Sequence, residues 1–315
     1  MGGSASLRFR ALPSALAFAL AIAGAMPGCS GDRERKNIAL LSDLETRLEE
    51  YGARAQGTLA VSFRDLRNLD AVALRRDEPL PAGPAGSLYV LIEAFRAMEA
   101  REIIPEETVD AEDRWPDITG NGFFRVSGDE GVIAGTAPPA RVPFRDLVER
   151  AAGGDPFAVN AVVRRLGGPA KLEAAAGRIG EGRAKFPAYE GDPIAARVNR
   201  LPATTAADLA AALHRLWRGD LLKPDATNAL RHLLERNASR RMIPRLLPPG
   251  AKVWHVSGTG TGTRSGAGLA DAAVVETTTG AFALVILGDN LRDPAYAADL
   301  CGEIAALCEQ HMRRR

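Results

Sequence analysis

The sequence is poor in the residues that build metal centres and redox sites. Of its 315 residues, 3 are cysteine and 4 are histidine, and 40 basic side chains face 39 acidic ones. No Cys-x-x-Cys pair occurs, and no histidine cluster has the spacing of metal ligands, so the sequence predicts no metal centre and no cofactor. The balanced charge lacks the basic excess of a nucleic-acid-binding surface, and we expect no nucleic-acid partner.

The sequence also gives no sign of a disulfide framework. Cys301 and Cys308 lie seven residues apart in a helical pattern, which separates them by two turns. That distance is too long for a disulfide on a straight helix. We therefore expect two buried thiols on one face of a C-terminal helix.

The N-terminus has the pattern of an export signal. Arg8 and Arg10 precede an apolar run over residues 15–25, which is too short for a stable membrane span. The glycine before Cys29 resembles a bacterial lipobox, in which the cysteine is lipidated after cleavage. We expect residues 1–29 to be a signal peptide of this type, with ordinary secretory cleavage and an uncleaved anchor as alternatives. The protein is then extracytoplasmic, in the periplasm or cell envelope, with a lipid on Cys29 as its membrane anchor.

The remaining chain is predicted to form two kinds of structure. Periodicity and turn residues indicate strands near both ends and helices in the middle. The expected strands cover residues 58–63, 71–74, 253–257, 270–277 and 281–287. The expected helices cover residues 38–51, 88–100, 145–152, 157–166, 171–179, 205–216, 224–235 and 294–311. Segments 36–80 and 250–312 would form an α/β subdomain and segment 81–249 a helical one, with the site in the cleft between them.

Two short motifs look like parts of a serine hydrolase without their lysines. Ser87 opens the helix over residues 88–100, and the residue one turn later is Val90. A serine hydroxyl is a weak nucleophile near neutral pH and needs an adjacent base, which a lysine at that place supplies and valine does not. The second motif is Val256-Ser257-Gly258, just before the last strands. The scaffold therefore suggests an enzyme whose chemistry is lost or replaced.

Together these motifs resemble the class A β-lactamase and penicillin-binding serine-hydrolase family over about residues 38–311. A further part of the resemblance begins with the segment from Arg145 to Glu149, continues with Asp155 and Asn160, and ends with the run Arg165-Leu166-Gly167-Gly168-Pro169. It looks like the helix pair around the family's Ser-Asp-Asn loop. The resemblance implies an α+β fold, in which a five-stranded antiparallel sheet with terminal helices lies beside a helical subdomain.

The resemblance gives the first motif two registers. In one, Ser87 matches the catalytic serine, Tyr89 an aromatic position, and Val90 replaces the lysine. In the other, Gly86 replaces the serine and Tyr89 the lysine. The position of Pro84 and the aromatic residue favour Ser87.

The other two motifs are also incomplete. Of the Ser-Asp-Asn motif, Gly154-Asp155-Pro156 keeps only Asp155, so the hydroxyl that relays a proton is missing. In the Lys-Thr-Gly motif, Val256 replaces the lysine that helps hold the substrate carboxylate. Losing one partner of a catalytic triad costs on the order of 10⁴ in rate, so these losses predict no useful β-lactam turnover.

One acidic residue of the family's site remains in the sequence. Tyr189-Glu190-Gly191 lies where the family's Ω-loop carries the glutamate that activates the deacylating water, while Ile194 replaces the loop's asparagine. Glu190 is either a base for Ser87, if both face the cleft, or a solvent-facing loop residue.

Few other residues can replace the missing groups. His255 lies two residues from Ser257 on a strand, so the two side chains share a face and a Ser-His contact is an alternative. Lys252 and Arg264 are alternatives for the lost anion anchor.

Three functions follow from these residues. The preferred one is a catalytically impaired protein that binds a peptidoglycan-derived or β-lactam-like ligand, or an envelope protein. The second is an active serine hydrolase with Ser87 as nucleophile and Glu190 as base. The third is a structural envelope lipoprotein whose cleft is filled by side chains such as Tyr89 and Phe157.

Overall fold

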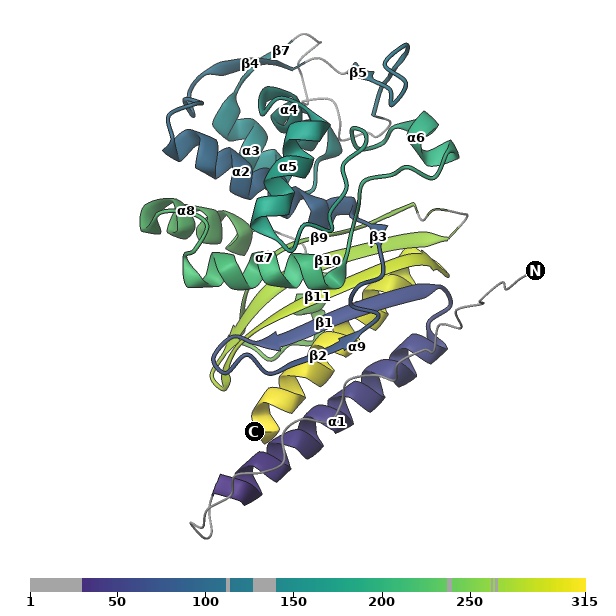
Figure 1. The fold of residues 1–315 in the computed structure, drawn as a ribbon, viewed down its shortest axis with the longest axis vertical. Coiled ribbons are helices and arrows are strands. Elements are labelled where there is room, and N and C mark those ends of the chain that lie inside the picture. The colour runs from purple at the N-terminus through teal and green to yellow at the C-terminus, as the bar shows by residue number, and fades with distance from the viewer. Residues whose placement is uncertain (1–29, 112–113, 127–139, 237–239, 262, 264–265) are drawn as a thin grey trace, which may run out of the picture.

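The computed structural model describes residues 30–111, 114–126, 140–236, 240–261, 263 and 266–315 (Figure 1). The predicted signal segment, Cys29 and Arg264 therefore lie outside the described residues. Within these ranges, no helix combines the length and the apolar character needed to cross a membrane.

A five-stranded antiparallel sheet forms the centre of the molecule, in the order β2-β1-β11-β10-β9. It joins strands from both ends of the chain and confirms the fold expected from the sequence. The bounds are β1 Thr58–Asp65, β2 Ala71–Leu74, β9 Lys252–Thr261, β10 Ala267–Thr277 and β11 Gly280–Leu291.

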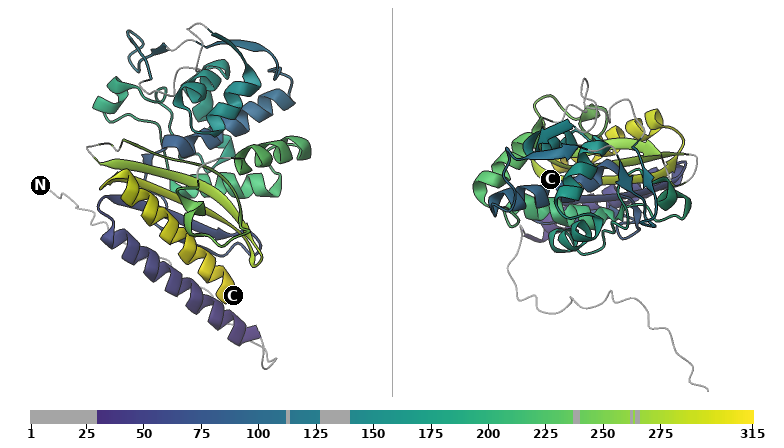
Figure 2. Two further views of the ribbon diagram at one scale, coloured as in Figure 1. Left: turned by 180° about the vertical axis from the view of Figure 1, so that it is seen from behind. Right: turned by 90° about the horizontal axis from the view of Figure 1, so that it is seen from above.

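Both faces of this sheet are buried, which explains the nearly continuous apolar run of β11. Ala283 and Val285 point into one apolar cluster, whereas Leu284 and Ile286 point into the other. The second cluster lies under two helices, α1 (Ser30–Arg54) and α9 (Pro294–Arg314). Figure 2 shows these terminal helices side by side on one face of the sheet.

The other face is covered by the helical layer, with α7 directly on the sheet (Figure 1). Its helices are α2 Ser87–Glu99, α3 Phe144–Ala152, α4 Pro156–Arg165, α5 Pro169–Ile179, α6 Pro193–Arg197, α7 Ala206–Arg218 and α8 Pro224–Glu235. The eight predicted helices are all present, and their ends differ from the predicted ones by a few residues, except that α1 begins eight residues earlier than predicted.

Several short elements were not predicted, because segments of two to five residues are too short to show a clear period. They are α6, the pairs β3 Leu80–Pro81 with β8 Ala203–Thr204, β4 Thr108–Ala111 with β7 Ala140–Pro143, and β5 Trp115–Pro116 with β6 Phe123–Phe124, and the 3₁₀ helices η1 Gly83–Gly86 and η2 Ile243–Leu246.

The start of α2 is fixed against the sheet edge by a close contact between η1 and β9. A Cβ atom on Gly258 would lie 2.6 Å from Cγ of Pro84, so only glycine fits there without displacing η1. This contact sets Ser87, the first residue of α2, beside the last residues of β9.

The two cysteines in α9 are buried and unpaired, as predicted from their spacing. Cys301 lies near a buried polar pair: Nδ1 of His255 is 2.9 Å from a carboxylate oxygen of Asp271, and the second oxygen of Asp271 accepts a hydrogen bond from the backbone of Ile243. These contacts fix η2 and α9 to the sheet on the face opposite to the helical layer.

Candidate functional site

A cavity of about 580 Å³ lies at the N-terminal end of α2, between the helical layer and the edge of β9. We call it the α2 cavity. Its lining comes from η1 and the first turn of α2, from α4 and α5, from the segment 186–196 and from the end of β9. The presence of this cavity argues against a cleft filled by Tyr89 and Phe157, because neither residue belongs to its lining.

Ser87 lines the cavity but is only 3% exposed. Its hydroxyl donates a hydrogen bond to the carbonyl of Pro84 at 2.7 Å, and its backbone N–H donates to the same carbonyl. Both donors of Ser87 are thus turned toward η1. Gly86 and Val90 line the cavity beside it, whereas Tyr89 points elsewhere, which favours the register with Ser87 at the serine position.

Among the described residues, no amine lines the cavity beside this hydroxyl. Val90, one turn along α2, is 1% exposed and packs in the core, as does Val256. Among the described residues that line the cavity there is no lysine, arginine or histidine. The described cavity lining therefore holds neither an amine that could accept the proton of Ser87 nor a cation that could bind a carboxylate.

The loop that carries the second motif has a structural role in this chain. Asp155 caps α4: its carboxylate accepts hydrogen bonds from the backbone of Phe157 at 2.9 Å and of Ala158 at 3.3 Å, and it forms an ion pair with Arg150. Gly154 has a φ of +83°, a conformation that glycine adopts at little cost. A serine at this position would be strained. The backbone conformation of this loop therefore disfavours the residue that would supply the missing hydroxyl.

The strand that carries the third motif offers no replacement chemistry. The hydroxyl of Ser257 is buried and has no hydrogen-bond partner among the described residues, while His255 is bound to Asp271. The alternative Ser-His contact between these two residues is therefore absent. Lys252 is exposed at the start of β9, outside the cavity lining, and Arg264 lies beyond the described residues.

Glu190 lies in the wall of the α2 cavity and is held there by its backbone. The side-chain amide of Asn160 donates to the carbonyl of Glu190 at 2.9 Å, and the backbone N–H of Glu190 donates to the oxygen of the same amide at 2.9 Å. Sequence reasoning used Asn160 only as a sign of the helix pair. Its double hydrogen bond places Glu190 in the same cavity as Ser87.

The carboxylate of Glu190 differs from that of Asp192 in having no hydrogen-bond donor among the described residues. No described residue forms a hydrogen bond or an ion pair with it, although Asp192, two residues on, accepts three backbone hydrogen bonds. Burial raises the pKa of Glu190 from 4.5 to about 7, and the negative charge of Asp155 adds to the increase. Near neutral pH, Glu190 can thus accept or donate a proton.

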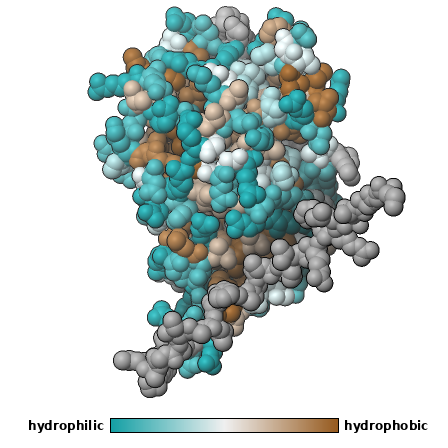
Figure 3. Space-filling view, in the orientation of Figure 1, coloured by the Kyte–Doolittle hydropathy of each residue, from teal (hydrophilic) through white to brown (hydrophobic). Residues whose placement is uncertain are grey.

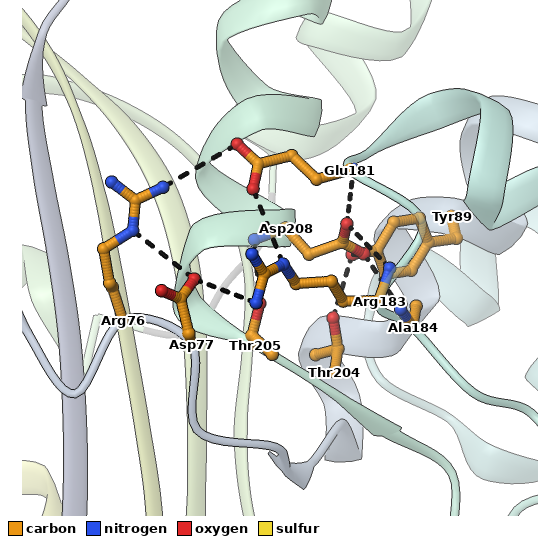
Figure 4. A network of polar contacts seen from close by, with 9 residues as sticks. All are labelled: Arg76, Asp77, Tyr89, Glu181, Arg183, Ala184, Thr204, Thr205 and Asp208. Atoms are coloured by element: carbon orange, nitrogen blue, oxygen red, sulfur yellow. Dashed lines mark hydrogen bonds and ion pairs between the residues drawn. The ribbon is translucent and has the colours of Figure 1, made fainter. Parts of the chain in front are cut away.

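A second buried carboxylate, Asp208 on α7, organises the neighbouring loop and was missed in the sequence. It is fully buried and accepts hydrogen bonds from the hydroxyl of Tyr89 at 2.7 Å and from the backbone of Glu181, Arg183 and Ala184 (Figure 4). The helix pattern concealed it, because Asp208 follows the cap Thr205 as an ordinary acidic residue of a first turn.

Outside Asp208, a surface chain of ion pairs continues the network. Arg76 contacts Asp77 and Glu181, and Arg183 contacts the same two acids (Figure 4). These contacts hold residues 181–184, which precede the segment that carries Glu190. Among the described residues, no group of three side chains has the arrangement of a metal site.

Residues 43–312 match the sequence profile of the beta-lactamase enzyme family. The chain belongs to this family. The helices, the sheet and the Asn160 contact to the loop of Glu190 are therefore parts of a β-lactamase-like protein, and the replaced motif residues are changes within that scaffold.

Solved structures agree on the fold. The structure of PBP-A has a TM-score of 0.73 at 18% identity, over 87% of this chain and 97% of that one. A β-lactamase from Chitinophaga pinensis DSM 2588 has a TM-score of 0.71 at 15% identity, over 84% and 97%. A chromosome-encoded β-lactamase of Vibrio parahaemolyticus has a TM-score of 0.72 at 17% identity, over 85% and 98%. No curated protein matches the chain in sequence.

Proposed function

We propose that this β-lactamase-like protein is catalytically silent and uses the α2 cavity to bind a ligand of the cell envelope. The observation that carries the proposal is the environment of Ser87. Its hydroxyl donates to the carbonyl of Pro84, and the position one turn along α2 is the buried side chain of Val90. A nucleophile without a base is inactive near neutral pH, whereas a preformed cavity still binds.

The alternative is a serine hydrolase that uses Glu190 as base. One observation favours it, since Glu190 and Ser87 line the same cavity and Glu190 titrates near neutral pH. The hydrogen bond from Ser87 to Pro84 opposes it, because the hydroxyl has to turn away from η1 before it can transfer its proton to Glu190.

Covalent labelling separates the two functions. Treatment with a fluorescent penicillin or a fluorophosphonate is expected to give no adduct by gel fluorescence or intact mass, in the protein and in Ser87→Ala alike. PBP-A, a point mutant of which has been solved as an acyl-enzyme complex with penicillin G, is the positive control. A label on the unchanged protein that disappears in Ser87→Ala would contradict the proposal and establish the hydrolase.

We also propose that the protein works outside the cytoplasm on a lipid anchor. The first turns of α1 support this, because residues 32–36 are exposed and that end of the helix projects beyond the sheet (Figure 1). Helix α1 begins at Ser30, directly after Cys29, so it would act as a spacer between a membrane and the domain.

A lipid on Cys29 has a direct test in a bacterial host. Cells that express the full chain and are fed radiolabelled palmitate should incorporate the label into this protein, and Cys29→Ala should lose it. Cys301→Ala is the matched control, because that thiol is buried in α9 and should not change labelling. An unlabelled protein in the membrane-free extract would contradict the anchor.

A further inference from the structure

Resting on the proposed binding function, we propose that the α2 cavity takes an organic amine, with an apolar body in the cavity and a protonated amino group paired with Glu190. This ligand class differs from the carboxylates that a cationic site would select.

The charged groups of the α2 cavity favour a cationic ligand. Among the described lining residues, only Glu190 and Asp192 are charged, and both are acidic. The carboxylate of Asp192 is occupied, because it accepts hydrogen bonds from the backbone of Ile118 at 2.6 Å, Ile194 at 2.8 Å and Ala195 at 3.1 Å. Glu190 is thus the acidic group that remains open to a ligand.

The cost of removing the Glu190 carboxylate from water also favours a cationic ligand. A carboxylate removed from water without a donor is costly, and burial raises the pKa of Glu190 for that reason. An ammonium group would supply both a positive charge and hydrogen-bond donors, and charge-assisted hydrogen bonds are among the strong ones. A ligand carboxylate would instead meet the charges of Glu190 and Asp155.

The rest of the cavity wall favours a ligand with an apolar body. Val90, Val159 and Phe186 contribute to a lining made largely of apolar side chains. Such a lining stabilises an aliphatic or aromatic body, and about 580 Å³ accommodates a small organic molecule. The exterior has a different character, since the face shown in Figure 3 is mainly hydrophilic with scattered apolar patches.

Three probes with the same apolar body test the proposal: phenylbutylamine, phenylbutanol and phenylbutanoate. Their dissociation constants for the purified protein are measured by calorimetric titration at about pH 8, where Glu190 is mainly ionised. We expect the amine to bind about tenfold tighter than the alcohol, and the carboxylate weakest, because one charge-assisted contact is worth about a factor of ten.

Two glutamate variants locate the effect. Glu190→Gln should reduce amine binding to the level of the alcohol and leave alcohol binding unchanged. Glu45→Gln, the same change on the exposed face of α1, should alter neither constant. Amine binding that survives Glu190→Gln would place the amino group elsewhere and overturn the inference.

The outcomes also separate this inference from the proposed function. Tighter binding of the carboxylate, equal binding of all three probes, or no binding of any would overturn the amine selectivity while leaving the labelling result untouched. A penicillin adduct on Ser87 would overturn the silent-protein proposal, whatever the order of the three affinities. The two experiments therefore fail independently.

Discussion

Two carboxylates near the site, the fully buried Asp208 and the partly buried Glu190, are opposite cases. Asp208 receives hydrogen bonds from three backbone N–H groups and from the hydroxyl of Tyr89. The carboxylate of Glu190 receives none from the described residues, although two hydrogen bonds with the Asn160 side chain hold its backbone. Asp208 therefore stabilises the fold, whereas Glu190 lines a cavity.

This difference separates the parts of the scaffold that were kept from those that were lost. Contacts that fix the backbone near the site are complete, as at Asp155, Asn160 and Asp208. The positions that would supply proton transfer and anion binding hold Val90, Gly154 and Val256 instead. The cavity is thus preformed, while the positions that the family resemblance assigns to proton transfer and anion binding hold other residues.

The largest expected effect follows from removing the saturated carboxylate. Asp208→Ala would leave three backbone donors without an acceptor and would remove one of the two partners of the Tyr89 hydroxyl, which also contacts Thr204. We therefore expect the free energy of unfolding to fall by about 3–5 kcal/mol. Urea denaturation measures it. Tyr89→Phe, which removes one donor and keeps the ring, should cost about 1 kcal/mol.

Asp77→Ala is the matched control for this change. Asp77 belongs to the same network in Figure 4, but its side chain is half exposed, and an exposed ion pair contributes little. If Asp208→Ala cost no more than Asp77→Ala, the two carboxylates would not differ as described.

A smaller effect of opposite sign is expected at Glu190. Its pKa in the folded protein, about 7, lies above the ordinary 4.5, so between these values the folded state binds more protons than the unfolded state and stability falls as the pH rises. Glu190→Gln removes this loss. After a discount for partial exposure, the variant should be about 1–2 kcal/mol more stable than the parent near pH 8.

The pH dependence is the sensitive part of this comparison. Near pH 4.5 the two proteins should unfold at the same urea concentration, and the difference should open as the pH rises toward 7. Glu45→Gln should show no such opening, because Glu45 is exposed on α1. Parallel stability curves for the parent and Glu190→Gln would show that the carboxylate is compensated by a partner.

Much of the fold could be predicted because it depends on local patterns. Apolar periodicity gave the helices over residues 88–100 and 224–235, and alternation gave the strands at both ends of the chain. The chemistry of the candidate site was harder to predict. The absent lysines at Val90 and Val256 are visible in the sequence, but whether another group replaces them depends on which side chains the fold brings together.

Individual residues show where prediction from sequence stopped. Asp208 has the pattern of a helix cap neighbour, and only the packing of α7 against α2 and the loop makes it a fourfold acceptor. His255 and Ser257 share a strand face, yet His255 forms its hydrogen bond with Asp271 on the neighbouring strand β10. Such choices are made by long-range contacts, which no window of sequence contains.

By itself, the sequence determined the order of the longer helices and strands, the family resemblance and the valines at positions 90 and 256, because periodicity, turn chemistry and residue identity are local properties. The tertiary structure decided that Ser87 turns to Pro84, that Asn160 holds Glu190 in the cavity wall, and that Glu190 faces that cavity without a described donor. Those outcomes depend on distances between segments far apart in the chain, and such distances exist only once the sheet and the helical layer have packed together.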